Sequence, residues 1–498
     1  MQKKEHSVSV RYVLKFLATL LAGCVNFIIL LWVPRILGPS DYGVFSYSTN
    51  FFTQIVGFIE SASSIAFFTK LSSENNNVRL IGFYQVVVLA TVLLLVALIC
   101  ISEMFSFHQA LLPHIEMDYV WLGASYAFLI WLNQVAIKIS DAHALTVYGG
   151  IIRAVLSGAT LFSFFIIISF HWLNLTVYFW FQNLTLFAVF LAFIIMLWIK
   201  NVLTIELFDW RNVPWGLYIK DFFFYCKPLY SYNIICIFSM AFDFWLLQHF
   251  SGLIQQGYYG FAFQIAAMCF FLTSTMIPIF MREVSRAYTQ EDWGRLGAFF
   301  KHYTVLFFIL TSCFSVFLMV NAREVAFIVG GEKYIPAVWV IALAMLYPVH
   351  QTLGQINGSM FYAMRRTEAY RNISFFTMVP GLGLSWALLA STSSFGLHLG
   401  ALGLVLKMLF LQVIGVNMQL VMLAKWLNQS FREYIAVQIL GLVAITVFSG
   451  MIHMLCTYIF GDTSPLVKLI IEGLLYGFSL LVIALFFSYK RKFKIFLD

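Results

Sequence analysis

Charged residues are scarce in this sequence: Asp, Glu, Lys and Arg together make up 10% of its 498 residues. Soluble domains carry about 25% charged residues, so this chain has too little polar surface to cover a water-soluble body. Long hydrophobic runs stand in place of charge, and 61% of the residues are hydrophobic. Because about 20 apolar residues span a bilayer, this composition favours a protein that crosses the membrane many times.

Several signals of soluble enzymes are also missing. The seven cysteines are scattered and form no CxxC pair, so we interpret them as small hydrophobic residues between helices. The sequence has no His-x-x-x-His pair and no Gly-rich loop that ends in Lys-Ser or Lys-Thr. We therefore predict that the protein is not an enzyme, that it holds no metal, and that it needs no cofactor beyond a coupling ion.

Hydropathy predicts an all-α polytopic membrane protein with about fourteen spans. The first apolar run follows a basic head and continues to Val33, which is too long for the apolar part of a cleaved signal peptide, roughly 7–15 residues. The longest polar connector runs from Lys200 to Asp221. The predicted spans lie near 12–34, 42–69, 80–103, 119–140, 146–171, 176–199, 222–249, 257–281, 298–320, 334–363, 372–391, 398–424, 435–459 and 466–488.

The positions of Lys and Arg test this number of spans, because short cytoplasmic loops are enriched in them. With the N-terminus in the cytoplasm, 24 of the 30 Lys and Arg residues, Lys138 among them, fall in cytoplasmic segments and four fall outside. The other two, Arg153 and Lys407, lie within spans. One helix too many or too few would invert every later loop and destroy this bias. We therefore predict that both termini are cytoplasmic, and we ascribe the net charge of +8 to topology rather than to nucleic-acid binding.

A weak internal repeat divides the spans. The segment from Leu37 to Phe45, after the first span, resembles the segment from Leu253 to Phe261, after the seventh, and in both an aromatic residue next to glycine opens the following helix. Chance is the alternative, since Gly and Tyr are common here. Six is an even number of helices, so the two halves would run parallel. The predicted domains are an N-terminal lobe (1–200), a connector (201–221), a C-terminal lobe (222–426), and an additional helix pair with a basic tail (427–498).

The stretch from Pro34 to Gly43 resembles the Arg-x-Leu-Gly-x-x-x-(Tyr/Phe)-Gly signature of polysaccharide-export flippases. These belong to the multidrug/oligosaccharidyl-lipid/polysaccharide (MOP) exporter superfamily, and the chain looks most like a Wzx-type O-antigen flippase. Many members of that group have twelve helices, whereas fourteen also resembles the lipid II flippase branch, whose last two helices add a groove for the lipid tail.

This resemblance implies a function in the bacterial inner membrane. Two lobes around a polar cavity would move undecaprenyl-diphosphate-linked O-antigen, or a similar repeat unit, from the cytoplasmic to the periplasmic leaflet by alternating access. The resemblance further implies an antiporter coupled to H+ or Na+. The expected partners are the lipid-linked oligosaccharide, membrane lipids, and a polysaccharide polymerase with its chain-length regulator.

Such a task requires a cationic, hydrogen-bonding cleft, because a diphosphate is anionic and sugars are polar. Ionisable groups inside spans are costly and are candidates for function. The cationic candidates are Lys15, Arg35, Arg153, Lys227 and Lys407, and the candidates for the polar lining are Asn26, Asn50, Gln351 and Gln355. For Lys15 and Lys227 the alternative is that the side chain extends to the membrane interface. For the four amides the alternative is hydrogen bonding between helices.

Two acidic residues within spans, Asp243 and Glu60, have two open interpretations. They would pair with the cations, or they would exchange a proton or a sodium ion during transport. Helix-interior prolines at Pro278, Pro348 and Pro380 are expected to bend the bundle, with irregular packing as the alternative.

Two other functions compete with the flippase. A multidrug exporter of the same superfamily predicts twelve helices and a cavity dominated by acidic residues, whereas cations outnumber acids inside these spans. A membrane O-antigen polymerase or ligase predicts a large periplasmic loop, and the longest outside loops here, near 104–118 and 321–333, are short.

Overall fold

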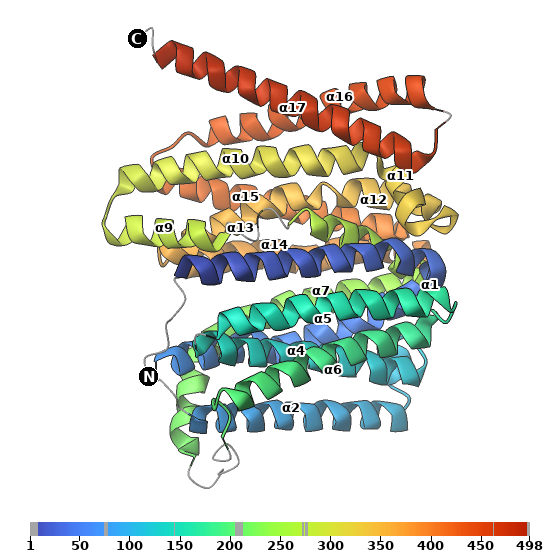
Figure 1. Cartoon of the computed structure of the whole chain (residues 1–498), viewed down its shortest axis with the longest axis vertical. Coiled ribbons are helices and arrows are strands. Elements are labelled where there is room, and N and C mark those ends of the chain that lie inside the picture. Colours follow the sequence, from blue (N-terminus) through green and yellow to red (C-terminus); the bar gives the residue numbers. More distant parts are fainter. Residues whose placement is uncertain are drawn as a thin grey trace. The chain divides into compact units, whose positions relative to one another are not determined.

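The computed structural model consists of helices, as hydropathy predicted (Figure 1). It describes residues 8–73, 78–143, 145–204, 213–270, 273, 277–461 and 463–495. Within these residues, twelve helices are long and apolar enough to cross a membrane. Two of the twelve are broken at a glycine, and hydropathy counted each of these two helices as a pair of spans, which is why it predicted fourteen. The predicted all-α polytopic fold is confirmed.

Most helices follow the predicted spans, but the predicted span 334–363 is divided among η4, α12 and α13, and α7 ends within the predicted span 257–281. The first part of the chain forms α1 (Val8–Ser73), α2 (Val78–Met104), α3 (His108–Leu111), α4 (Met117–Ala142), α5 (Thr146–Ser169), α6 (Leu175–Ile199) and α7 (Trp215–Met268). The second part forms α9 (Ile277–Thr289), α10 (Trp293–Val320), α11 (Ala322–Val325), η3 (Ala326–Gly330), η4 (Glu332–Ala337), α12 (Val338–Ala344), α13 (Tyr347–Ala363), α14 (Thr367–Leu389), η5 (Thr392–Ser394), α15 (Gly400–Trp426), α16 (Phe431–Phe460) and α17 (Pro465–Ile495).

Glycine kinks divide α1 and α7 into two limbs each. A straight helix of 66 residues, the length of α1, would be about 100 Å long, far more than the roughly 30 Å of a bilayer core. The backbone turns at Gly38, with φ 79° and ψ 173°, and at Gly252, with φ 77° and ψ −175°. Positive φ favours glycine. The first and second limbs are 8–37 and 39–73 in α1, and 215–251 and 253–268 in α7.

The chain forms two compact units. Unit 1 contains Met1–Gly260 and Met378–Gly400, and unit 2 contains Phe261–Thr377 and Ala401–Asp498. These units are defined by contacts within the structure, whereas the predicted lobes were defined by the repeat, and the two divisions cut the chain at different places. The lobe boundaries therefore stay a prediction.

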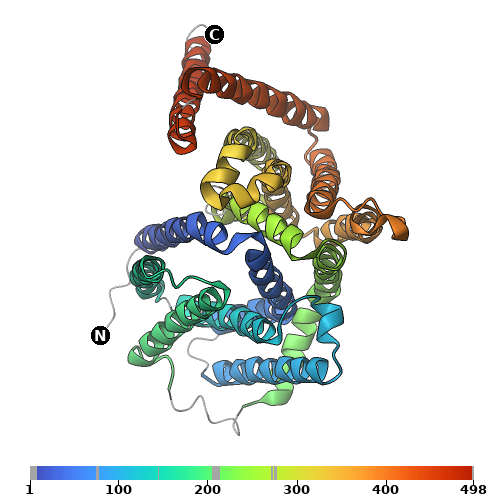
Figure 2. The same cartoon turned by 90° about the vertical axis from the view of Figure 1, so that its right-hand side faces the viewer.

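Aromatic packing holds the middle of unit 1 together. Phe45, on the second limb of α1, lies 4.6 Å from Tyr178 and 5.0 Å from Phe179 on α6, measured between ring centroids. The same ring meets Tyr126 of α4 edge-on at 5.9 Å. The second limb of α1, α4 and α6 thus pack side by side (Figures 1 and 2).

Unit 2 is built around a hydrophobic cluster to which α9, α10, α13, α14, α15 and α16 contribute. One of the prolines expected to bend helices, Pro348, lies instead where a helix begins, as the second residue of α13. Proline suits the first helical turn, where its missing N–H has no partner to lose. Pro278 lies in α9 and follows residues 274–276, which are outside the described part of the chain, so a bend at Pro278 stays a prediction. Pro380 lies inside α14 as predicted.

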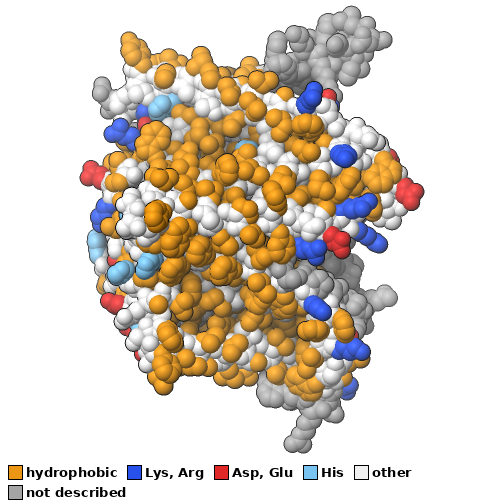
Figure 3. Space-filling view, turned by 180° about the vertical axis from the view of Figure 1, so that it is seen from behind, with side chains coloured by type: hydrophobic (Ala, Val, Ile, Leu, Met, Phe, Trp, Pro, Cys, Tyr) orange, Lys and Arg blue, Asp and Glu red, His pale blue; other side chains and the backbone are white. Residues whose placement is uncertain are grey.

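The surface is that of a protein surrounded by lipid. Large hydrophobic side chains are exposed along the long helices, for example Leu93 at 61% and Phe162 at 70%. In Figure 3 hydrophobic side chains cover most of the visible face, and charged side chains lie toward the ends of the helices.

Candidate functional site

The second limbs of α1 and α7 cross just beyond their kinks, and each carries a glycine at the crossing. A Cβ atom on Gly43 would lie 2.1 Å from the carbonyl oxygen of Leu253, and a Cβ on Gly257 would lie 1.9 Å from that of Pro39. Ordinary contacts of a Cβ atom begin at 3.4 Å. Only glycine therefore allows the two backbones to approach this closely.

This crossing has local two-fold symmetry. Gly252 follows Gly38 by 214 positions, and the same spacing separates Gly257 from Gly43 and Leu253 from Pro39. Reciprocal contacts of this kind arise when two equivalent segments meet about a two-fold axis. The kink glycines thus define which residues of the two halves are equivalent. This alignment differs by two residues from the alignment of Leu37 with Leu253.

The same spacing marks where the axis lies. Gly260 is the equivalent of Ser46, and a Cβ on Gly260 would lie 2.1 Å from the Ser46 hydroxyl oxygen. Equivalent residues meet each other only on a two-fold axis, so the axis passes near this pair.

Glu60, one of the two acidic candidates, forms an ion pair inside unit 1. The Lys138 ammonium of α4 lies 3.0 Å from Glu60 Oε1, and both side chains are 24% exposed. Lys138, which the sequence analysis counted among the cytoplasmic cations, lies near the end of α4 and donates to an acid on the second limb of α1. The five cationic candidates therefore missed the residue that pairs with Glu60.

Asp243, the other acidic candidate, is buried on the first limb of α7. Its Oδ1 lies 2.5 Å from the Ser385 hydroxyl of α14, and that hydroxyl also lies 2.9 Å from the carbonyl oxygen of Gly381. A hydroxyl has one hydrogen to donate. The Ser385 hydroxyl donates to Asp243 Oδ1 and is also within hydrogen-bond distance of the Gly381 carbonyl oxygen, so its one hydrogen is shared between two acceptors.

The cationic candidates come from separate segments. Arg35 is exposed near the end of the first limb of α1, and Lys227 is exposed on the first limb of α7. Arg153 is half-buried on α5, where its Nε lies 3.5 Å from the Gly149 carbonyl oxygen. Lys407 is buried on α15. The side chain of Lys15 lies outside the described part of α1, so a shared cationic cavity stays a prediction.

Three of the four amide candidates bond to neighbouring side chains. Gln351 of α13 accepts from the Gln412 amide of α15 at 2.5 Å, and Gln355 accepts from the Thr273 hydroxyl at 3.4 Å. Asn50 donates to Ser46 one turn earlier at 3.2 Å. Asn26 is exposed on the first limb of α1. The bonds of Gln351 and Gln355 are of the kind that joins helices in membranes.

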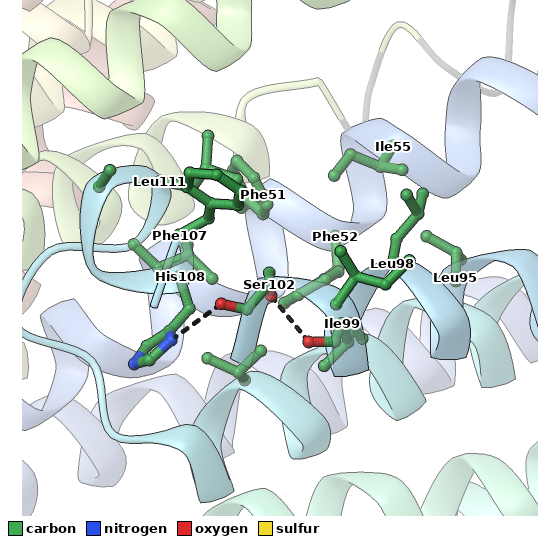
Figure 4. Close-up of a pocket in the computed structure, with 14 residues that line it drawn as sticks. Phe51, Phe52, Ile55, Leu95, Leu98, Ile99, Ser102, Phe107, His108 and Leu111 are labelled. Atoms are coloured by element: carbon green, nitrogen blue, oxygen red, sulfur yellow. Dashed lines mark hydrogen bonds between the residues drawn. The ribbon is translucent and has the colours of Figure 1, made fainter. Parts of the chain in front are cut away.

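A pocket of about 420 Å³ opens in unit 1 between the second limb of α1, α2 and α3 (Figure 4). Its described lining is apolar, with Phe51, Phe52 and Leu98 among its residues, and includes neither Lys nor Arg. The Ser102 hydroxyl donates to the Ile99 carbonyl oxygen at 2.8 Å, within its own helix. The lining suits a hydrocarbon chain and not a diphosphate.

A buried polar network joins the last two helices to α10 and α11 in unit 2. Glu472 of α17 is 0% exposed, and its Oε1 accepts from the Asn321 amide at 2.6 Å. Nδ1 of His453, on α16, lies 3.2 Å from Glu472 Oε2. One turn before Glu472, Lys468 lies 2.9 Å from Glu324 Oε1. A buried charge that loses its partner is strongly destabilising, so this network fixes where α16 and α17 dock.

The electrostatics of Glu324 reflect this pairing. Burial alone would raise the pKa of its carboxyl group, but the hydrogen bonds from Lys468 and from its own backbone N–H, with the charge of Lys468, outweigh burial. The pKa of Glu324 therefore lies below its ordinary value. At the other end of α10, Lys301 pairs with Glu433 of α16 at 2.8 Å, but both are more than half exposed, and such pairs contribute little.

Solved structures resemble this arrangement although sequence comparison finds no relative. No family model matches the chain, and no curated protein matches it in sequence. The lipid II flippase MurJ, in an inward closed conformation, superimposes with a TM-score of 0.70 at 14% identity, covering 96% of this chain and 99% of its own. The chain shares its fold with this flippase and with the MOP superfamily transporters described below. Its match to MurJ extends over nearly the whole length of both chains.

Other MOP superfamily transporters show the same fold over less of the chain. An inward-facing MATE family transporter of the MOP superfamily gives a TM-score of 0.62 at 15% identity and covers 86% of this chain and 97% of its own. A MOP superfamily transporter from Pyrococcus furiosus, described with a binding pocket of reverse polarity, gives 0.53 at 15% identity and covers 84% and 96%. All of these neighbours are transporters.

Sequence reasoning missed the partners rather than the charges. Lys138 is far in the sequence from its partner Glu60, and Ser385 is far from its partner Asp243. No local sequence pattern therefore predicts either pair. The network of the last helix pair did leave a signal, because Lys468 and Glu472 stand four residues apart in an apolar run. Two ionisable residues on one face of a membrane helix are expected to have partners.

Proposed function

We propose that this chain is a flippase that moves undecaprenyl-diphosphate-linked O-antigen, or a similar polysaccharide repeat unit, from the cytoplasmic to the periplasmic leaflet. It works by alternating access in the bacterial inner membrane, with both termini in the cytoplasm. The MOP fold supports a transporter. The observation that most favours a lipid-linked cargo is the presence of the helix pair α16 and α17.

Coverage of the chain supports this choice of cargo. MurJ covers 96% of the chain, whereas the MATE family transporter covers 86%. The difference of ten percentage points corresponds to about 50 of the 498 residues, and α16 and α17 comprise 30 and 31 residues. A pair of additional helices beside a transport bundle gives the prenyl tail of a lipid-linked substrate an apolar surface to follow, which a water-soluble drug does not need.

The docking of this pair supports a working role for it. Glu472, Asn321, Lys468 and Glu324 are buried or nearly buried at the junction with α10 and α11. Ionisable residues are expensive in a membrane and are retained where they are used. The network holds the pair at a fixed place on the bundle, as a tail-binding surface requires.

Proton coupling through Asp243 is the second part of the proposal. Asp243 is buried on α7 and accepts a hydrogen bond from the Ser385 hydroxyl of α14. A buried acid whose partner lies on another helix can bind and release a proton as the helices move. H+ is the coupling ion that we propose to test at this residue.

Deleting the gene in its host, where no paralogue is present, tests the cargo. Lipid-linked repeat units are expected to accumulate in the cytoplasmic leaflet and to become inaccessible to a membrane-impermeant label added to the periplasm. Repeat units that still reach the periplasmic leaflet at the normal rate would refute the flippase. Normal glycan export together with new sensitivity to cationic drugs would favour the multidrug exporter.

A further inference from the structure

A second pocket, polar where the first is apolar, lies in unit 2 at the ends of α9, α10 and α13. Its volume is about 690 Å³, within the range of roughly 300–1,000 Å³ of small-molecule sites. Its lining includes the aromatic residues Tyr288, Trp293 and Tyr362, the charged residues Glu291 and Arg365, and the hydroxyl of Thr289.

Two tight turns bring these residues together. Residues 290–292 join α9 to α10, where the Asp292 carboxylate caps α10 by accepting from the Arg295 N–H at 2.9 Å. The other turn follows α13. Each turn contains one lining residue with a left-handed backbone, Glu291 at φ 55° and Arg365 at φ 57°. The turns thus fix one acidic and one basic side chain at the same pocket.

Two of these aromatic side chains are about half exposed. Trp293 is 51% exposed and Tyr362 is 48% exposed. Tyr288 supports Trp293 edge-on, with their ring centroids 5.8 Å apart and the planes at 87°. A half-exposed aromatic ring that is packed against a neighbouring ring can stack on an apolar ligand face.

The combination of side chains selects the chemistry of the ligand. Pyranose sugars have apolar faces of C–H groups and a rim of hydroxyl groups. Aromatic rings match the faces, and a carboxylate, a guanidinium and a hydroxyl can accept from and donate to the rim. A diphosphate fits less well, because Glu291 places a negative charge beside Arg365.

We propose that this pocket binds the glycan of the lipid-linked substrate, at the face where the substrate is loaded. The inference rests on the proposed function. By the distribution of Lys and Arg, the turns after α9 and α13 both lie on the cytoplasmic side, where the substrate is made available. The prenyl tail stays in lipid, the diphosphate binds elsewhere, and the pocket recognises the sugars.

Trp and Tyr are also common at membrane interfaces for packing against lipid headgroups, and a matched control separates the two roles. Trp198 of α6 is 56% exposed, close to the value for Trp293, and lies next to Lys200 at a predicted cytoplasmic helix end. It does not line the pocket. Trp198→Ala therefore removes an interfacial indole without touching the proposed site.

The test is a binding measurement on the purified full chain in lipid nanodiscs with two probes. One is the undecaprenyl-diphosphate-linked oligosaccharide extracted from the deletion strain, and the other is glycan-free undecaprenyl diphosphate. Wild type is expected to prefer the first. Trp293→Ala and Tyr362→Ala are each expected to reduce that preference about tenfold, equivalent to about 1.4 kcal/mol, and to leave binding of the glycan-free lipid unchanged.

Each outcome decides one claim. A preference kept in both pocket variants, or lost to the same extent in Trp198→Ala, would overturn the glycan site and leave the flippase standing. Wild type that binds neither probe would instead count against the proposed function. Trp293→Phe keeps an aromatic ring and should retain most of the preference, which guards against a variant that merely misfolds.

Discussion

Replacing Gly43 by alanine tests the close crossing of α1 and α7. The new methyl group would lie 2.1 Å from the Leu253 carbonyl oxygen, more than 1 Å inside ordinary contact. The obstacle is backbone, which cannot rotate away, so the two limbs must separate. Overpacking of this kind costs about 1–3 kcal/mol. Gly57, on the same limb, has nothing within 4 Å of its Cβ position. Gly57→Ala should therefore be neutral or stabilising by roughly 0.5–1 kcal/mol through helix propensity.

The assay is thermal unfolding of the purified chain in detergent, with both variants measured beside wild type. Gly43→Ala is expected to unfold at a lower temperature than Gly57→Ala. Gly257→Ala should match Gly43→Ala, because its Cβ would meet the Pro39 carbonyl oxygen at 1.9 Å. The double variant should cost less than the sum, since one separation of the limbs makes room for both methyl groups. Equal stability of Gly43→Ala and Gly57→Ala, or full additivity, would refute the two-fold crossing.

Three further predictions concern the charged groups. In a double-mutant cycle, Glu60→Gln and Lys138→Met should each destabilise the chain, and the pair should couple by about 1 kcal/mol or more in thermal unfolding; additive effects would contradict the ion pair. The pKa of Glu324 lies below its ordinary value of 4.5, so its stabilising effect is present above that pH and is lost as pH falls through the folded-state pKa. Wild type should therefore lose more stability on acidification than Glu324→Gln, and parallel pH profiles would contradict this. Asp243→Asn should abolish the dependence of flipping on an imposed proton gradient, and unchanged dependence would exclude coupling at this residue.

The helices were predictable because each span leaves a continuous record in the sequence. Helices such as α2 and α6 agree with the hydropathy prediction to within about two residues, and the distribution of Lys and Arg among the loops supported the predicted number of spans. The kinks in α1 and α7 were harder to predict from the sequence. Aromatic residues beside glycine drew attention to the right segments, but Gly38 and Gly252 define the equivalent positions. Their role depends on φ, which the letters of the sequence do not display.

The candidate site was predictable only as a set of separate charges. Glu60 and Asp243 stand out because acids are rare in apolar runs, yet Lys138 and Ser385 come from other helices. Such pairings depend on how helices rotate and cross, and a single sequence contains no direct record of that. The polar pocket was missed for the same reason, since Trp293 and Tyr362 are 69 positions apart and meet only through two turns.

The most direct test of the account is translocation by the purified chain in proteoliposomes. Undecaprenyl-diphosphate-linked oligosaccharide, extracted from the deletion strain, is placed in the vesicle membrane, and a lectin added outside reports the glycans that face outward. We predict that, after the outward-facing glycans are removed enzymatically, new ones appear faster with the chain than in protein-free vesicles, and faster still under a proton gradient. Identical rates with and without the chain would contradict the central claim.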